Sequence, residues 1–198
     1  MKLFITLIGA VAFTGSCLAQ DFTKAMATAK TSYSAGKLED AHFALLQAMQ
    51  EVDLTVGKEV LKLLPTKMDV METIAKDDNV ASNVGFIGAT IHRSYTKGTR
   101  KADITIISNS PLIGMTNAVL NMPFAGMMSN GNNKNVKIQG YKARLEKQSG
   151  STSDKNSYEL QIPLGTALFT FKVDDCTDAQ ILAFADTIPL QQIAKLIE

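Results

Sequence analysis

The spacing of the apolar residues changes near residue 80, and this change constrains the fold more than any other feature of the sequence. Up to about residue 79 the apolar residues recur every three or four positions, the period of an amphipathic helix. From Val84 onward they alternate with polar residues, as in Ile87, Ala89 and Ile91, the period of a half-buried strand. The sequence therefore predicts an α+β protein with a helical first part and a sheet in its second part.

Two apolar stripes define the start of the helical part. The first runs from Phe22 to Tyr33 and the second from Leu38 to Val52, with Gly36 between them. Helices joined around a single glycine pack antiparallel, because the connection is too short for any other arrangement. We therefore expect a helical hairpin.

The helical spacing continues beyond the hairpin. Apolar residues at 56, 60, 61, 63 and 64 predict helix up to Pro65, with Gly57 as a point where it could break. Met68, Met71 and Ile74 then predict one more short helix. Residues 20–79 are accordingly interpreted as the hairpin with its connecting helices, and residues 80–198 as a sheet domain.

The sheet domain is expected to contain five strands. Their order with the helices is strand, strand, helix, strand, strand, strand, helix, helix, and the third strand shifts its phase at Gly140, which suggests a bulge. Thr177 and Gln180 form the two halves of a capping box before the first of the last two helices. A mostly antiparallel five-stranded sheet, covered by helices on one face and with the hairpin packed on it, satisfies this order.

The hairpin, at about residues 22–52, resembles a single tetratricopeptide repeat. The resemblance rests on small, aromatic and glycine positions in a fixed order: Ala29, Tyr33, Gly36, Leu38, Ala41, Leu45 and Ala48. One such repeat cannot bury its apolar face alone, so the resemblance implies that the hairpin leans on another surface. The element order of the second part is similar to small exported PsbP/Mog1-like α+β domains, which implies an accessory or binding role more often than an enzymatic one.

The first twenty residues, MKLFITLIGAVAFTGSCLAQ, have the parts of a secretory signal: a basic end, an apolar run and small residues. Cleavage after Ala19 would give a signal peptide of residues 1–19 and a periplasmic or secreted protein. Alternatively, Thr14 to Cys17 resembles a lipobox, and lipidation of Cys17 would give an outer-membrane-anchored lipoprotein. Both alternatives predict export to the cell envelope, without a transmembrane span.

The charge balance excludes nucleic acid as a predicted partner. The chain has 20 Lys and Arg residues and 19 Asp and Glu residues. Loss of Lys2 with the signal peptide leaves 19 of each sign, and there is no basic run to match a phosphate backbone.

Motifs for catalysis and for cofactors are absent from the sequence. It holds no Gly-x-Ser-x-Gly, His-Glu-x-x-His, phosphate-binding loop or glycine-rich dinucleotide turn. We therefore predict a protein that is not an enzyme and that uses no cofactor or metal. The alternative is a cell-envelope enzyme that uses His92 as an acid-base group. Cys176 is expected to be a buried structural cysteine, and the aspartates beside it to favour the start of a helix rather than calcium.

The most distinctive chemical feature is the stretch NMPFAGMMSNGNNKN, residues 121–135. Methionine repacks against varied partners, so Met122, Phe124, Met127 and Met128 are candidates for binding a protein partner or an apolar ligand. Two alternatives stay open: the helix end closes the sheet core, or the thioethers carry copper. The sequence thus predicts an exported binding or accessory protein whose partner it does not identify.

Overall fold

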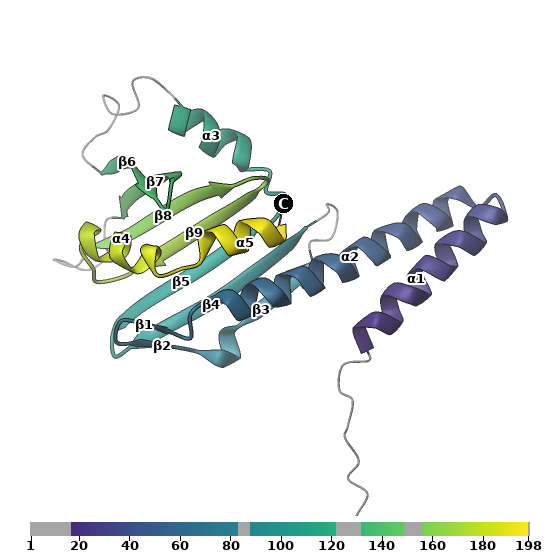
Figure 1. Cartoon of the computed structure of the whole chain (residues 1–198), viewed down its shortest axis with the longest axis horizontal. Coiled ribbons are helices and arrows are strands. Elements are labelled where there is room, and N and C mark those ends of the chain that lie inside the picture. Colours follow the sequence, from purple (N-terminus) through teal and green to yellow (C-terminus); the bar gives the residue numbers. More distant parts are fainter. Residues whose placement is uncertain (1–16, 83–87, 122–131, 149–155, 198) are drawn as a thin grey trace, which may run out of the picture. The chain divides into compact units, whose positions relative to one another are not determined.

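The computed structural model describes residues 17–82, 88–121, 132–148 and 156–197, with side chains from Asp21 onward (Figure 1). The predicted α+β class is confirmed, with helices preceding the sheet. The chain divides into two compact units, Met1–Glu51 and Val52–Glu198. The boundary falls within one long helix.

The first unit is the predicted helical hairpin. Helix α1 spans Cys17–Ser34 and helix α2 spans Leu38–Leu63. Gly36 has φ +74°, its N–H donates to the carbonyl of Tyr33, and the N–H of Lys37 donates to the carbonyl of Ser32. This pair of hydrogen bonds is the glycine-dependent way of ending a helix, so the glycine ends α1 as the sequence predicts.

The part of α2 beyond Glu51 belongs to the second unit. Gly57 does not break the helix; it lets α2 approach the sheet, because a Cβ at this position would meet Cγ1 of Val80 at 2.5 Å. One and two turns later, Val60 and Leu64 are buried in the hydrophobic core of this unit.

The second unit is built on an antiparallel sheet in the order β1-β2-β4-β5-β9-β8-β7-β6, with β3 also paired to β4. The strands are β1 Lys67–Met68, β2 Met71–Thr73, β3 Asn79–Ser82, β4 Ala89–Lys97, β5 Arg100–Ile107, β6 Asn133–Ile138, β7 Tyr141–Gln148, β8 Ser157–Leu164 and β9 Ala167–Val173. A 3-10 turn, η1, spans Ala75–Asp77.

The expected count of five strands was wrong, because the described residues form nine. The short helix expected after Pro65 is instead the strand pair β1 and β2, followed by η1 and β3. The bulge expected at Gly140 is instead a tight turn: Gln139 and Gly140 have φ values of +49° and +91°, and they join β6 to β7 as two separate strands.

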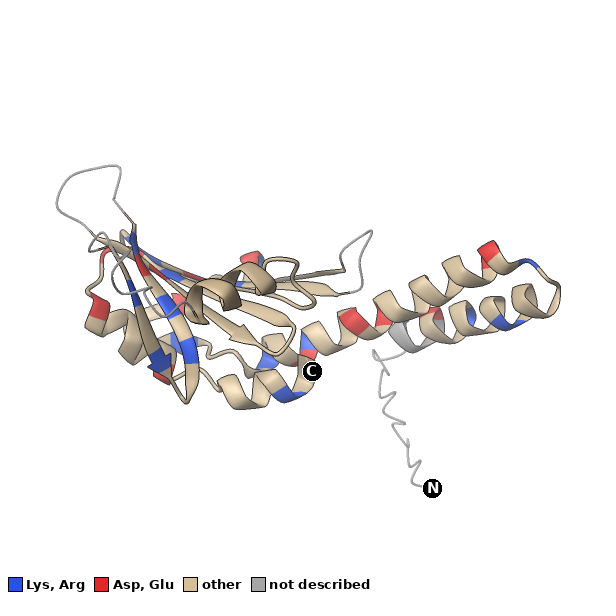
Figure 2. Cartoon of the chain, turned by 90° about the horizontal axis from the view of Figure 1, so that it is seen from above, with Lys and Arg blue, Asp and Glu red and all other residues tan. Residues whose placement is uncertain are grey.

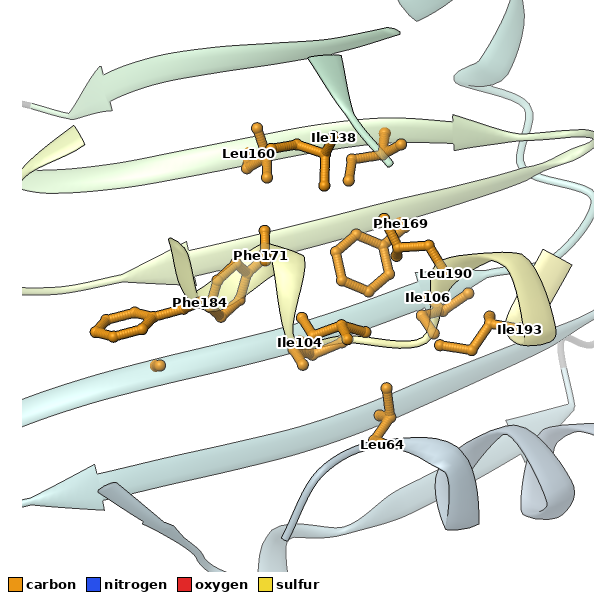
Figure 3. Packing of buried hydrophobic residues seen from close by; sticks show 14 of the residues in the cluster. Leu64, Ile104, Ile106, Ile138, Leu160, Phe169, Phe171, Phe184, Leu190 and Ile193 are labelled. Atoms are coloured by element: carbon orange, nitrogen blue, oxygen red, sulfur yellow. The ribbon is translucent and has the colours of Figure 1, made fainter. Parts of the chain in front are cut away.

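Side chains alternate between two faces of the sheet. One face carries the core, and α4 (Asp178–Asp186) and α5 (Leu190–Ile197) pack their apolar sides on it together with the end of α2. Figure 3 shows the aromatic centre of this core, where Phe169, Phe171 and Phe184 meet isoleucines of β5 and α5. The predicted capping box of α4 is present, with Thr177 and Gln180 bonded reciprocally.

The remaining helix, α3 (Ile113–Asn121), is not part of this core cluster. It lies near β7 and β8, where Lys142 donates to the side chain of Asn121 at 2.7 Å. The other face of the sheet carries polar residues in register, such as Thr105, Thr170 and Gln161 on the neighbouring strands β5, β9 and β8.

Candidate functional site

The methionine-rich candidate site lies outside the described residues. Met122, Phe124, Met127 and Met128 all fall within 122–131, directly after α3. The partner, apolar-ligand and copper interpretations of this segment therefore stay predictions. Cys17 opens α1, but its side chain is not among those described, so its lipidation also stays a prediction.

His92 belongs to a polar cluster on the sheet, formed by the register of β4 and β5. His92 faces Thr105, and Ser94 faces Asp103. Nδ1 of His92 lies 3.1 Å from Oγ1 of Thr105, and Nε2 lies 3.0 Å from Oγ of Ser94. The Ser94 hydroxyl donates to Oδ1 of Asp103 at 2.6 Å.

The direction of these hydrogen bonds decides what the cluster can do. Since the single hydroxyl proton of Ser94 goes to Asp103, the Ser94 oxygen accepts from Nε2 of His92, and in the neutral imidazole Nδ1 then accepts from Thr105. An activated serine needs the opposite polarity, with its proton directed at the imidazole. Ser94 is also buried, and His92 lines neither of the two cavities described below. The cluster can pass a proton along the sheet, but it does not present a nucleophile.

Cys176 is buried and free, as the sequence predicts. Its Sγ lies 3.4 Å from the carbonyl of Val173. Burial, with a smaller contribution from Asp174 and Asp175, raises the pKa of the Cys176 thiol to about 11. The thiol is therefore neutral and unreactive at physiological pH.

A small cavity of about 100 Å³ lies in the second unit, beside the part of α2 that packs on β4. Asp53 lines it and accepts a hydrogen bond from the N–H of Gly88 at 2.8 Å; burial raises the pKa of Asp53. The volume is well below the roughly 300 Å³ at which small-molecule sites begin. Among the described residues, no group of three or more His, Cys, Asp or Glu side chains could hold a metal ion.

The hairpin separates its small and large apolar residues. Its seam is made of alanines, and the following are buried: Ala25, Ala29, Ala41, Ala44 and Ala48. The large apolar residues of the same stripes are exposed, from 38% for Phe22 to 70% for Tyr33. Alanine lets the two helices approach closely, so the larger side chains flank the contact instead of filling it.

These large side chains form one surface, which we call the apolar face: Phe22, Met26, Tyr33, Leu38, Leu45 and Met49. At about 100° per residue, the first three occupy a sector of about 40° on α1, and the last three a sector of about 40° on α2. In both helices this sector lies to the same side of the buried alanines, namely the side towards which the helix turns as the residue number increases. Because the helices run in opposite directions, both sectors open to the same side of the hairpin.

The opposite side of the hairpin is polar. A groove of about 290 Å³ runs along the seam there, which we call the polar groove, and its lining comes from both helices: Asp21, Lys24, Ala25, Thr28, Gln47, Gln50 and Glu51. This groove independently fixes which side of the seam is polar. Figure 2 shows that long stretches of both helices carry no charged residue.

The sequence contains a signal for this surface in the sizes of the residues that make up each apolar stripe. Each stripe mixes alanines with large residues, and only the alanines are buried between the helices. Small residues at a helix contact exclude large ones from the same contact, so the separation could have been predicted from residue size.

Comparison with protein-family models, with curated proteins and with solved structures found no match for this chain. Among the described residues, no helix is sufficiently long and apolar to cross a membrane. Of the His92 cluster, the small cavity beside α2 and the apolar face, the apolar face exposes the most apolar side chains.

Proposed function

We propose that the chain is an exported, non-enzymatic binding or accessory protein of the bacterial cell envelope, and that the apolar face of the hairpin binds a protein partner. The observation that carries the proposal is the exposure of six large apolar side chains on one side of two adjacent helices. At about 200 Å² for each fully exposed side chain, their exposed area is on the order of 600 Å². Monomeric proteins seldom leave a larger apolar patch uncovered.

The shape of the apolar face favours a protein over a lipid surface. Its side chains stand in two rows at helical spacing, with the alanine seam between them, which is the pattern that packs against helices. Helices that lie on membranes usually carry basic residues around the apolar side, whereas residues 17–51 hold three lysines against four acidic residues. The resemblance to a single tetratricopeptide repeat supports the same proposal, since such a repeat needs a neighbouring surface.

The proposal is tested by photo-crosslinking in living cells. A photoreactive residue is placed on the apolar face, at Met26 or Leu45, and at the matched control positions Lys24 and Gln47 in the polar groove. We expect discrete protein adducts from the apolar face and none from the polar groove. Equal labelling from both sides, or no protein adduct from either position on the apolar face, would contradict the proposal.

Export is tested on the same material. Mass spectrometry of the protein recovered from the envelope distinguishes a chain that begins at Gln20 from one that begins with an acylated Cys17. A chain that keeps its first 19 residues and remains inside the cell would contradict export.

The His92 cluster supports a second candidate, a cell-envelope enzyme in which His92 transfers a proton. Its specific support is the continuous hydrogen-bonded path from Thr105 through His92 and Ser94 to Asp103. For this candidate, His92→Gln would abolish complementation of a gene deletion while the crosslinks from the apolar face persist. For the binding proposal, the same variant complements normally.

A further inference from the structure

We propose that the occupant of the apolar face is a second copy of this chain, so that two hairpins form a four-helix bundle around a twofold axis. This inference rests on the proposed function, because it names the partner of the same surface. Three features of the hairpin support it: the width of the apolar face, the level of its residues along the two helices, and the charges at its margins.

The width of the face matches a second hairpin better than a single helix. One helix buries a single stripe, whereas the apolar face has two stripes separated by the alanine seam. Its exposed area, on the order of 600 Å², is three quarters of the roughly 800 Å² that each partner buries in an interface of standard size. A second apolar face supplies a surface of the same width, area and composition.

The six residues are also matched in level along the hairpin. Tyr33 and Leu38 lie beside the turn, on the last and first turns of their helices. Seven residues farther from the turn are Met26 and Leu45, and four residues beyond those are Phe22 and Met49. At 1.5 Å per residue these pairs stand at three levels, about 10 and 6 Å apart.

This matching selects a twofold axis parallel to the helices. Such an axis places α1 over α2 of the second copy, antiparallel to it, with the two turns at the same end of the bundle. Tyr33 then meets Leu38 of the second copy, Met26 meets its Leu45, and Phe22 meets its Met49. His42, which is exposed within the α2 stripe, comes opposite Ala29 of the second copy, where the small side chain leaves space.

The charges at the margins agree with the same axis. Lys30 borders the face on the outer side of α1, and Glu39 borders it on the outer side of α2; both are exposed. The parallel axis brings Lys30 within about one helical turn of Glu39 of the second copy, and symmetry makes two such pairs. An axis perpendicular to the helices would instead set Lys30 near Thr23 of the second copy and leave both charges without a counter-charge.

The first test measures the mass of the protein purified from the envelope, by sedimentation equilibrium over a range of concentrations. We expect a dimer at micromolar concentration. Leu45→Lys places a charge in the centre of the interface and should raise the dimer dissociation constant at least about 100-fold. The control Gln47→Lys adds the same charge on the polar groove and should change it less than about threefold. Circular dichroism checks that both variants remain helical.

The second test exchanges the marginal charges. Lys30→Glu and Glu39→Lys should each weaken the dimer about tenfold, because each places like charges together at two symmetric positions. The double variant restores opposite charges and should bind within about twofold of the native protein. Single variants without effect, or a double variant as weak as the sum of both, would overturn the proposed arrangement.

Failure of this inference is distinguishable from failure of the proposed function. A monomer at 100 μM overturns the second copy as occupant, and the crosslinking experiment then decides the function: adducts to another protein keep it, and none reject it. A monomer whose apolar face is protected from hydrogen exchange by its own sheet domain also overturns the inference. A dimer that Leu45→Lys does not weaken would overturn it as well.

Discussion

The guanidinium of Arg93 holds the carboxylate of Asp78 through two hydrogen bonds, from Nε at 2.9 Å and from Nη2 at 2.6 Å. Its third donor, Nη1, reaches the carbonyl of Leu64 at 2.7 Å, and the hydroxyl of Tyr95 reaches the carbonyl of Pro65 at 2.8 Å. Carbonyls at the end of a helix have no partner within the helix. Arg93 and Tyr95, which point to the core side of β4, therefore bind the chain where α2 ends.

Removal of the carboxylate should destabilise the second unit strongly. Arg93 is only 7% exposed, so Asp78→Ala leaves a buried charge without its counter-charge. We expect a loss of about 3 kcal/mol in the free energy of unfolding, measured by urea denaturation. Asp78→Asn keeps one acceptor and should lose less. Equal stability of the alanine variant and the native protein would show that Arg93 is solvated by other means.

Two helical glycines provide a matched pair for testing close packing. At Gly57 a Cβ would meet Val80 at 2.5 Å and Ile91 at 3.3 Å, whereas at Gly114 nothing lies within 4 Å. Alanine favours a helix over glycine by about 1 kcal/mol. Gly114→Ala should therefore raise the free energy of unfolding by up to that amount. Gly57→Ala should lower it by about 1–3 kcal/mol, because the clash exceeds the helical gain.

The measurement is thermal and urea unfolding of both variants under one set of conditions. If Gly57→Ala stabilised the protein as much as Gly114→Ala, α2 would not be held against the sheet as closely as the structure shows. If neither variant changed the stability, helix propensity would not govern the exposed position in α3.

The number of strands could not be predicted fully from the spacing of apolar residues, because short strands and turns can imitate other patterns. Met68 and Met71 are three residues apart, which is helical spacing, but a two-residue turn at Asp69, with φ +54°, produces the same spacing between paired strands. At Gly140 a shift of phase fits a bulge and a tight turn equally well, and only pairing in space separates them. The long strands and the hairpin, by contrast, repeat one period for enough residues to be predicted.

The candidate site was predicted less well than the fold. The polar cluster around His92 depends on the register of β4 with β5, which sets His92 beside Thr105 and Ser94 beside Asp103. Sequence spacing along one strand carries no information about that register. The apolar face depends on which residues of a stripe enter the helix contact, a question of side-chain size that periodicity alone does not address.

Asp53 should make the stability of the second unit depend on pH. Burial raises the folded-state pKa above the ordinary value of 3.8, while the hydrogen bond from Gly88 opposes the rise. A raised pKa favours the protonated folded form. The stabilisation that protonated Asp53 gives the folded state is therefore complete below pH 3.8 and is lost as the pH rises through the folded-state pKa. Asp53→Asn keeps an acceptor for the N–H of Gly88 without a charge. It should be at least as stable as the native protein at pH 7.

The check for Asp53 is urea unfolding at pH 7, 5 and 3.5. The difference in the free energy of unfolding between Asp53→Asn and the native protein should shrink as the pH falls. Asp53→Ala leaves the N–H of Gly88 without this acceptor and should lose about 1 kcal/mol at each pH. An advantage of the asparagine variant that grew towards low pH would reverse the sign argued for this group.

Cys176 should be inert in the folded protein and become reactive only on unfolding. Its thiol is buried against β9, and its pKa is raised to about 11 from the ordinary value of 9.0. Only the thiolate attacks disulfide reagents, so at pH 8 both burial and the raised pKa suppress the reaction. In a Cys17→Ser background, labelling with a chromogenic disulfide should be at least about 100-fold slower in buffer than in guanidinium chloride.

The same pKa fixes the sign of the alkaline dependence of stability. Because the folded-state pKa exceeds the unfolded value of 9.0, the contribution of the neutral thiol is complete below pH 9 and is lost as the pH rises towards 11. Cys176→Ala lacks this ionisation, so the native protein should lose stability relative to that variant between pH 9 and 11. Fast labelling of the native protein at pH 8, together with a stability difference that stays constant between pH 9 and 11, would place the Cys176 thiol at the surface instead of in the core cluster.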